Sequence, residues 1–562
     1  MLHTLILTLA VVALVVLGRK IYRRWLVSRA KHRSLTGHGR IARRLARHVP
    51  FYGYSDDEIF CVDGADDQLL ARRQRGFRRL QQRLAERSTA GRAASNALSP
   101  GVSDMQFTSA YRVPFQFRQF AMKHLPIGSF VEASAGVQLR DVDGHWSYDV
   151  GGSYGVNLLG YDFYKGTMQR AMDRVAELGP VLGPYHPLIA ENVARIRELS
   201  GLDEVSFHMS GTEAVMQAVR LARYHSKKPK LVMFCGAYHG WWDGVQPGVG
   251  SQRSYRDILN LNDVSDRSLA VLRSRDDIAC VLINPLQALH PNKSATSDAM
   301  LVGSERSACY DREYYGDWLR QLRAVCTERG IALIFDEVFV GFRLARGGAQ
   351  EYFDIQADMV TYGKTIGGGL PVGVIAGRRE LMRRFRDDSP TDICFARGTF
   401  NSHPLVMAAM NEFLVRTDSE EFRSAAASVD TVWNKRFDRL NEALADADLP
   451  LFVHNMVSVG LVAYRAVSRY NWLFQYYLRA EGLSLSWVGT GRFIFSHNYT
   501  DNDFTAVIER VVTAGQKMSA DGWWETPTGL TNKAIKRGVL KEILRARFGP
   551  RIDPLLERIP AE

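Results

Sequence analysis

Lys364 is the first residue whose setting suggests chemistry, because it lies alone in an uncharged, glycine-rich run. Residues 361–373 read TYGKTIGGGLPVG. A lysine normally lies at the surface, where its ammonium group stays hydrated. The run is therefore either an exposed loop with an ordinary lysine or part of a pocket that keeps an amine for chemistry. These residues alone leave both interpretations open.

An acidic pair ends another apolar run. In IALIFDEVFVGF, residues 331–342, Asp336 and Glu337 follow a predicted buried strand, and Lys364 follows the next predicted strand. A buried carboxylate without a cationic partner is costly. The sequence therefore predicts a carboxylate and an amine, each at the end of a strand.

A phosphate could bind at the start of a predicted amphipathic helix. HMSGTEAVMQAVRLARYH, residues 208–225, places Ser210, Gly211 and Thr212 at that start. Free backbone N–H groups and the helix dipole attract anions there. SGTE is also an ordinary N-terminal cap, so the motif alone does not decide.

A loop rich in aromatic residues follows another predicted strand. CGAYHGWWDG, residues 235–244, holds Tyr238, His239 and two tryptophans between glycines. The rings could stack on a flat ligand, or the loop could simply be packed against the protein. Together, the four segments would supply a phosphate cradle, an aromatic platform, a buried carboxylate and an amine.

The elements that must position these groups are short apolar runs that alternate with helical segments from about residue 130 onward. The runs are KLVMFCG, ACVLINP, IALIFDEV, MVTYGK and VGVIAG. Runs without polar alternation are typical of strands buried on both faces, and the alternation with helices predicts an α/β fold with a mostly parallel sheet. Ligands bind beyond the carboxyl ends of the strands in such sheets.

Composition and charge exclude several other classes of protein. The 562 residues predict two or three structural units, and six scattered cysteines offer neither a disulfide framework nor a zinc site. The net charge is +12, but residues 1–55 contain eleven Lys and Arg and no acidic residue, so the remainder is close to neutral. A nucleic-acid-binding protein would spread this charge over its recognition surface. We therefore expect no nucleic-acid partner.

The N-terminus predicts membrane attachment. The apolar segment Leu5–Gly18 precedes RKIYRRWLVSRAKHR, without the basic flank and cleavage site of a signal peptide. With Tyr22 and Trp25 at the interface, residues 1–27 could span a bilayer once, leaving the catalytic body in the cytoplasm. A segment that does not span would still be held against anionic lipid by its basic residues.

Two further basic regions flank the sheet-forming part. Residues 28–105 are predicted to be a basic helical region and linker. Its helix at 66–87 either touches lipid or a partner or, as the favoured alternative, packs on the main body, and residues 88–104 are the linker. Residues 521–562 are predicted to be a basic amphipathic tail, with Ile535 and Val539 on its apolar face. The tail could lie on the membrane or dock on the body.

The ordered set SGTEA, YHG, IFDEV–GFR, GK–IGGGLPVG and GT–N–HP resembles the class III aminotransferases of pyridoxal-phosphate fold type I, over about residues 130–515. Among them, the set is most similar to the glutamate-1-semialdehyde aminomutases. The resemblance implies a smaller C-terminal α+β domain beside the large one. The implied boundaries are residues 106–165 for the N-terminal part of the small domain, 166–415 for the large cofactor-binding domain and 416–520 for the C-terminal small domain.

The resemblance also assigns roles to individual residues. Lys364 would be the Schiff-base lysine, and Asp336 would pair with the pyridine nitrogen; these two are the predicted catalytic residues. A Gly-Thr pair from a neighbouring subunit would complete the phosphate site, which implies a homodimer with shared active sites. The predicted cofactor-binding residues are Ser210, Gly211, Thr212, Tyr238 and His239, then Asp336, Val338, Lys364, Gly398 and Thr399.

Departures from the family pattern lie mainly on the substrate side. Polar residues of the pattern are replaced by Met209, by Asn284 and by either Leu289 or Phe339, and His290 is an alternative partner for the hydroxyl of the cofactor ring. Gly489 stands where the aminomutases have a glutamate. The Ser/Arg pair of the aminomutases has only a loose match near Arg118. We therefore expect a membrane-tethered aminotransferase acting on an amphiphilic aldehyde or ketone. A true aminomutase and a catalytically inactive membrane scaffold are the alternatives.

Overall fold

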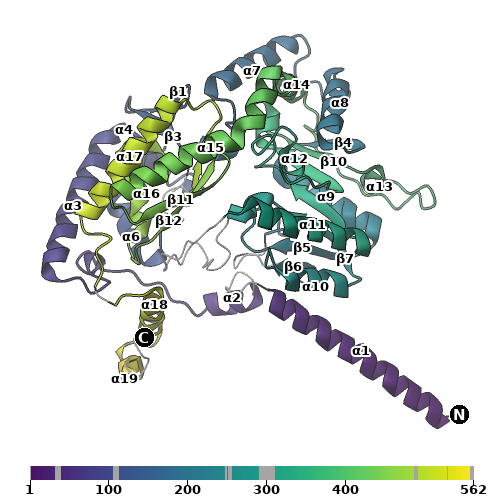
Figure 1. The fold of residues 1–562 in the computed structure, drawn as a ribbon, viewed down its shortest axis with the longest axis horizontal. Coiled ribbons are helices and arrows are strands. Elements are labelled where there is room, and N and C mark those ends of the chain that lie inside the picture. Colours follow the sequence, from purple (N-terminus) through teal and green to yellow (C-terminus); the bar gives the residue numbers. More distant parts are fainter. Residues whose placement is uncertain are drawn as a thin grey trace.

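The computed structural model describes residues 2–31, 39–105, 113–246, 250, 256–289, 310–486, 492–527 and 529–556. A large sheet flanked by helices lies beside a second body built from the segments that precede and follow it in the chain (Figure 1). One long N-terminal helix extends away from both.

The large sheet has seven strands in the order β4-β10-β9-β8-β7-β5-β6. Every pairing that does not involve β10 is parallel, whereas β10 runs antiparallel to β4 and β9, so the predicted mostly parallel sheet is confirmed. Each position of β7, β8, β9 and β10 is buried, as their unbroken apolar runs require. The strands are β4 (Glu204–His208), β5 (Lys230–Phe234), β6 (Ile258–Leu261), β7 (Ile278–Ile283), β8 (Ala332–Asp336), β9 (Met359–Gly363) and β10 (Gly373–Gly377).

Helices flank this sheet. They are α7 (Tyr161–Arg174), α8 (Leu188–Ser200), α9 (Gly211–Ser226), α10 (Asp266–Ser274), α11 (Arg312–Arg329), α12 (Gly348–Phe353), α13 (Arg379–Met382) and α14 (Pro404–Asp418), with the short turns η4 (Pro285–Leu289) and η6 (Lys364–Gly367). Buried valine, leucine and alanine side chains along α9 form the contact with the sheet.

The second body is built from chain segments that precede the large sheet and segments that follow it. β13 pairs in parallel with β3, which closes a four-stranded sheet whose other strands come from before the large sheet. Its elements are β1 (Val131–Ala135), β2 (Gln138–Asp141), β3 (Trp146–Asp149), η3 (Gly152–Gly155), α15 (Glu420–Asp446), β11 (Leu451–Met456), β12 (Val459–Tyr464), η7 (Asn471–Leu473), α16 (Phe474–Ala480), β13 (Leu483–Ser484), β14 (Arg492–Ile494) and α17 (Asp501–Ala520).

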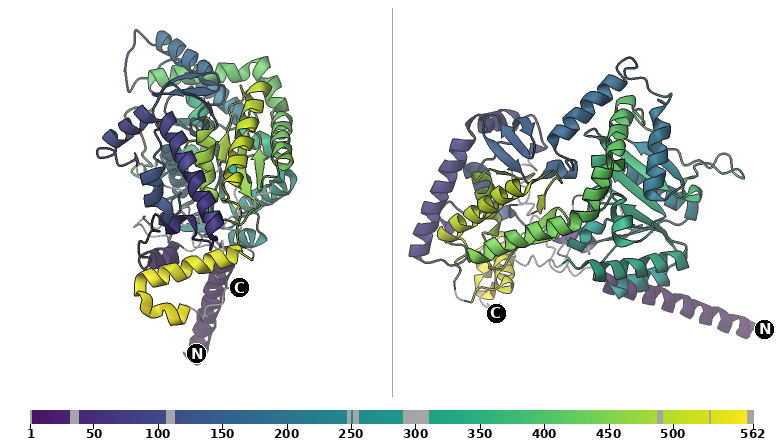
Figure 2. Two further views of the ribbon diagram at one scale, coloured as in Figure 1. Left: turned by 90° about the vertical axis from the view of Figure 1, so that its left-hand side faces the viewer. Right: turned by 45° about the horizontal axis from the view of Figure 1, so that its top comes forward.

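The N-terminal helix α1 (Leu2–Ala30) is continuous from its apolar part into the body (Figure 2). Its apolar residues are exposed, but Leu26 and Ala30 are buried where the last turns contact α10. The carbonyl of Ala30 accepts a hydrogen bond from the Asn262 backbone at 2.8 Å, and Arg23 pairs with Asp276 at 2.5 Å. The helix is therefore fixed to the large domain through its C-terminal end.

The remaining helices come from the N-terminal and C-terminal parts of the chain. They are α2 (Gly39–Ala46), η2 (Glu58–Phe60), α3 (Asp67–Arg87), α4 (Thr89–Leu98), α6 (Phe115–His124), α18 (Asn532–Phe548), η8 (Pro550–Ile552) and α19 (Asp553–Leu556). Among them, α3 and α18 contact the second body. Phe77 and Leu80 of α3 are buried beside α16, and Ile535 and Val539 of α18 are buried as well. The apolar faces of both helices are thus covered by protein.

The predicted linker at 88–104 is wrong in part, because α4 occupies residues 89–98. Its small residues allow a close approach: a Cβ on Gly91 would come within 3.4 Å of the Gly128 backbone. Asp143 accepts hydrogen bonds from the Ala90 and Gly91 backbones, at 2.6 and 2.9 Å. Small residues that suggested flexibility instead permit packing.

Candidate active site

Lys364 is half-buried at the end of a buried strand rather than lying in an exposed loop. It follows β9 directly and begins η6 with a left-handed φ of 51°. Burial lowers the pKa of its amine, the Arg343 guanidinium lowers this pKa further, and Asp336 opposes the change by raising it. A lysine with a lowered pKa holds a larger neutral fraction, and the neutral amine is the form that acts as a nucleophile or base.

Asp336 ends β8, next to the strand that positions Lys364. Its Oδ2 lies 2.7 Å from His239 Nδ1, and both residues are almost completely buried. Its Oδ1 accepts a hydrogen bond from the Val338 backbone at 3.1 Å. The second imidazole nitrogen, Nε2, is buried without a hydrogen-bond partner among the residues that the structure describes. Hydrogen bonds to both carboxylate oxygens of Asp336 therefore hold the Asp336–His239 pair in one orientation.

The start of α9 lies against the same strand ends. Ser210 caps the helix by accepting a hydrogen bond from the Glu213 backbone at 3.2 Å. A Cβ on Gly211 would come within 2.6 Å of Val338, and one on Gly363 would lie 3.1 Å from the same side chain. The first turn of α9 thus packs on the loop that follows Asp336, with room for glycine only.

The aromatic loop reaches both of these groups. A Cβ on Gly240 would come within 2.5 Å of the Thr212 hydroxyl, so the loop lies on the N-terminus of α9. Burial raises the pKa of Tyr238, and the Asp336 carboxylate raises it further. The Tyr238 side chain is nevertheless 61% exposed in the single chain. Its ring is therefore close to the site and open on one side.

Gly398 and Thr399 are not brought to this cluster within one chain. Both lie on an exposed loop before α14, and no hydrogen bond in the described part of the chain links them to Lys364 or Asp336. The neighbouring Arg397 donates to the carbonyl of Gly183 at 3.0 Å. Their assignment to a neighbouring subunit's site stays a prediction.

Arg343 belongs to the site but is absent from the residues predicted for it. It is fully buried, and it donates to Ser458 Oγ at 2.9 Å and to the Phe495 carbonyl at 2.6 Å. It also donates to the Gly155 carbonyl at 3.3 Å. Burial lowers its pKa to about 10. A single arginine inside the apolar run VFVGFRLA was the available signal.

Of the positions that depart from the family pattern, Phe339 lies beside Lys364. The Phe339 ring centroid is 5.7 Å from Lys364 Nζ, whereas Leu289 is buried in the core and neither side chain can donate a hydrogen bond. Met209 contributes its backbone N–H, which Glu213 accepts at 2.9 Å. His290 and Gly489 lie outside the described residues.

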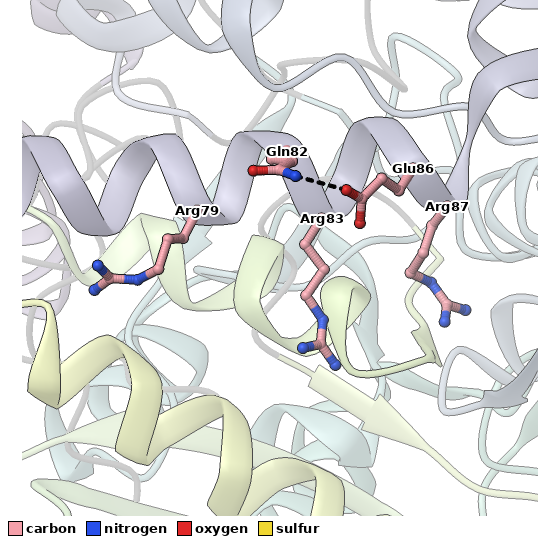
Figure 3. Close-up of a pocket in the computed structure, with 5 residues that line it drawn as sticks. All are labelled: Arg79, Gln82, Arg83, Glu86 and Arg87. Atoms are coloured by element: carbon pink, nitrogen blue, oxygen red, sulfur yellow. Dashed lines mark hydrogen bonds between the residues drawn. The ribbon is translucent and has the colours of Figure 1, made fainter.

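A separate hollow on α3 is lined by Arg79, Gln82, Arg83, Glu86 and Arg87, all from that one helix (Figure 3). Two of its arginines already have acidic partners on the second body. Arg79 pairs with the Asp521 carboxylate, and Arg83 pairs with the Glu481 carboxylate at 2.9 Å. The hollow therefore lies where α3 forms ion pairs with the second body, and its lining residues do not include Lys364, Asp336 or His239.

The fold and this site define a fold type I pyridoxal-phosphate enzyme. Solved structures share the fold: a transaminase with bound PLP (TM-score 0.61, 24% identity, covering 77% of this chain and 98% of that one) and a glutamate-1-semialdehyde aminomutase from Pseudomonas aeruginosa (TM-score 0.63, 19% identity, covering 80% and 99%). A β-phenylalanine aminotransferase from Variovorax paradoxus has a TM-score of 0.63 at 24% identity, covering 81% and 99%.

The family model described as aminotransferase class-III matches residues 119–514, so the chain belongs to that family. Curated relatives named glutamate-1-semialdehyde 2,1-aminomutase are 34% identical over 297 residues in Alkaliphilus oremlandii and 33% over 351 residues in Methanocaldococcus jannaschii. The matches cover 50% and 59% of this chain, and only 64% and 76% of the relatives' lengths. The predicted family and its pyridoxal 5′-phosphate cofactor are confirmed.

The residues present fit this cofactor. The N-terminus of α9 offers backbone N–H groups to a phosphate beside a glycine that no larger residue could replace. The buried Asp336 would hold the pyridine nitrogen, with His239 as its support. Lys364 supplies the buried amine next to it.

Proposed function

We propose that the chain is a membrane-tethered aminotransferase that transfers an amino group to the carbonyl carbon of an amphiphilic aldehyde or ketone. The observation that carries the proposal is the buried Lys364 amine, with its lowered pKa, beside the fixed Asp336–His239 pair. Family membership supplies the reaction class.

Bound pyridoxal phosphate supplies an electron sink that acidifies the C–H bond next to the reacting nitrogen. The neutral Lys364 amine would take that proton and deliver it to the carbon on the other side of the nitrogen, because it is the base that these strand ends present. Arg343 favours the neutral amine by disfavouring a second positive charge nearby. Asp336, oriented by His239, would hold the ring nitrogen in its protonated form.

The second candidate is an intramolecular amino transfer of the aminomutase type. The names of the curated relatives favour it. Gly489 at the expected glutamate position counts against the aminomutase reaction. We therefore rank amino transfer between two substrates first.

Spectroscopy and labelling test the catalytic assignment. Borohydride should fix the cofactor to the peptide that carries Lys364. Lys364→Ala should abolish this labelling and reduce turnover by several orders of magnitude, because nucleophile and base are one residue. The exposed Lys533→Ala is the matched control and should change neither. Label on another lysine would refute the assignment.

We propose that α1 is a single-pass anchor that leaves the catalytic body in the cytoplasm. Residues His3–Ala30 form a helix long and apolar enough to cross a bilayer by length and composition, and Arg19 onward supplies the basic cytoplasmic flank. Because Leu26 and Ala30 pack on the body, deleting only residues 2–17 should release an active, soluble enzyme. A full-length protein that stays in the high-speed supernatant would exclude the anchor.

The homodimer with shared sites is part of the same proposal. Gly398 and Thr399 are exposed in the single chain, as residues completing a partner's phosphate site would be. Co-expression of Lys364→Ala and Thr399→Ala chains should restore about a quarter of native activity, since half of the dimers are mixed and each has one intact site. No restoration in a verified mixed dimer would exclude sharing.

A further inference from the structure

Helix α16 carries buried polar atoms that the protein does not satisfy. Tyr476 is fully buried, and its hydroxyl has no hydrogen-bond partner in the part of the chain that the structure describes. The Nε of Arg479, one turn further on, is likewise buried and unpartnered there. Buried polar groups are usually paired, and these two lie one helical turn apart, so both are available to a bound group.

Arg479 also lacks a counter-charge. Arg479 donates a hydrogen bond to a neutral acceptor, the Leu485 carbonyl, at 3.1 Å. Burial lowers the pKa of the guanidinium to about 10, and the groups that partly offset this are the hydroxyls of Tyr476 and Tyr154. No carboxylate lies within ion-pair distance among the described residues. The side chain thus stays protonated at neutral pH and keeps part of its surface exposed.

A chain of contacts leads from Arg479 to the catalytic lysine. The Tyr154 hydroxyl donates to the Ser486 carbonyl at 3.3 Å, next to the residue that accepts from Arg479. Tyr154 belongs to the η3 turn, where a Cβ on Gly155 would come within 2.6 Å of the Phe339 ring. That ring is the one beside Lys364 Nζ. Arg479 therefore lies on the far side of the η3 turn from the reacting amine.

The η3 turn is held in an unusual conformation. Ser153 and Tyr154 both have left-handed backbones, with φ of 46° and 57°, between two glycines of positive φ. Such conformations cost free energy and persist where the surroundings fix them. The conformation of the turn therefore fixes the position of Tyr154 between Phe339 and Arg479.

We propose that Arg479 and the Tyr476 hydroxyl bind an anionic group, a carboxylate or a phosphate, carried by the substrate at a distance from its reacting carbon. Planar guanidinium groups bind such oxyanions through paired hydrogen bonds. The inference rests on the proposed aminotransferase function and specifies its substrate class. It supplies an anion-binding residue in a chain where the Ser/Arg pair of the aminomutases has no clear counterpart.

The site is tested with pairs of amines that differ in whether they carry an anionic group. For each amine, kcat/KM is measured from the loss of the cofactor's absorbance band. The pairs are 4-aminobutyrate with butylamine and 2-aminoethyl phosphate with ethanolamine. The native enzyme should prefer the anionic member of one pair by about 10- to 100-fold, as expected for a charged hydrogen bond. The preferred pair then identifies carboxylate or phosphate.

Variants assign the preference to Arg479. Arg479→Met should reduce this preference to near one by lowering kcat/KM for the anionic amine, and Tyr476→Phe should reduce it partly. Arg479→Lys keeps the charge without the paired donors and should retain a weakened preference. Arg439→Met, an arginine on α15, is the control and should preserve it. A preference that survives Arg479→Met would overturn the proposal.

A binding measurement in the absence of turnover gives a second readout. In the Lys364→Ala background, glutarate or inorganic phosphate should raise the Tm, and the added Arg479→Lys or Tyr476→Phe change should lessen that rise. Equal Tm shifts in all three proteins would overturn the inference. Failure of every amine to alter the native absorbance would instead refute the proposed function, so the two failures are distinguishable.

Discussion

Removing the imidazole from the His239–Asp336 pair should cripple catalysis without unfolding the protein. The two side chains are buried, and Nδ1 lies 2.7 Å from Oδ2, which is a short, well-formed hydrogen bond. A hydrogen bond to a charged group contributes about 1.5–3 kcal/mol. At about 1.4 kcal/mol per factor of ten, His239→Ala should slow the amine half-reaction by about 10- to 150-fold.

His239→Asn is the informative partner variant. The asparagine amide nitrogen is attached to Cγ, as Nδ1 is in histidine, so it can donate to Asp336 from nearly the same place. His239→Gln places its amide nitrogen one bond further out and cannot. We therefore expect the asparagine variant to recover most of the lost rate and the glutamine variant to resemble alanine.

Stopped-flow decay of the cofactor's visible absorbance after mixing with amine provides the rate, and cofactor titration provides the affinity. Circular dichroism at the assay temperature checks that the variants remain folded. Equal rates for His239→Ala and the native enzyme would refute the role of the pair. Equal defects in the asparagine and alanine variants would show that the imidazole acts through Nε2 instead.

Three further changes probe the surroundings of the site. Gly373→Ala would place a Cβ 2.0 Å from the Ser210 carbonyl oxygen and should destabilise the fold by about 1–3 kcal/mol in urea unfolding, whereas Gly538→Ala in open space on α18 should stabilise it slightly. Burial raises the pKa of Glu337 to about 8, so the native protein should lose stability relative to Glu337→Gln as the pH rises from about 5 to 8, measured as a difference in Tm. Arg343→Met should raise the pKa of the Lys364 amine and move the acidic limb of the kcat profile to higher pH, and Arg343→Lys should leave that limb in place.

The cofactor side of the site was predictable because each of its residues lies immediately beyond an apolar run. Lys364 and Asp336 follow β9 and β8, and the N-terminus of α9 follows β4. Parallel strands carry such residues to one edge of the sheet whatever lies between them in the chain. Local pattern and global position therefore give the same answer for these groups.

Other features were hidden because they depend on contacts between distant segments. Arg343 reaches Ser458 and Phe495, more than a hundred residues later, and no local pattern reveals that a buried arginine will end among carbonyl groups there. The α4 helix was masked by small residues that also occur in linkers. Its first turn donates two hydrogen bonds to Asp143, a partner outside the segment.

The division of the site between two bodies has a chemical consequence. Lys364, Asp336 and the α9 N-terminus come from the large sheet, whereas Arg479 comes from α16 of the second body. If Arg479 binds the substrate's anionic group as proposed, replacing side chains on α16 should change which anionic group is accepted without moving Lys364 and Asp336. Arg343 links the two bodies, since it touches the Phe495 carbonyl on one side and influences Lys364 on the other. The proposal thus assigns the reaction class to residues at the sheet edge and the choice of substrate to a helix of the second body.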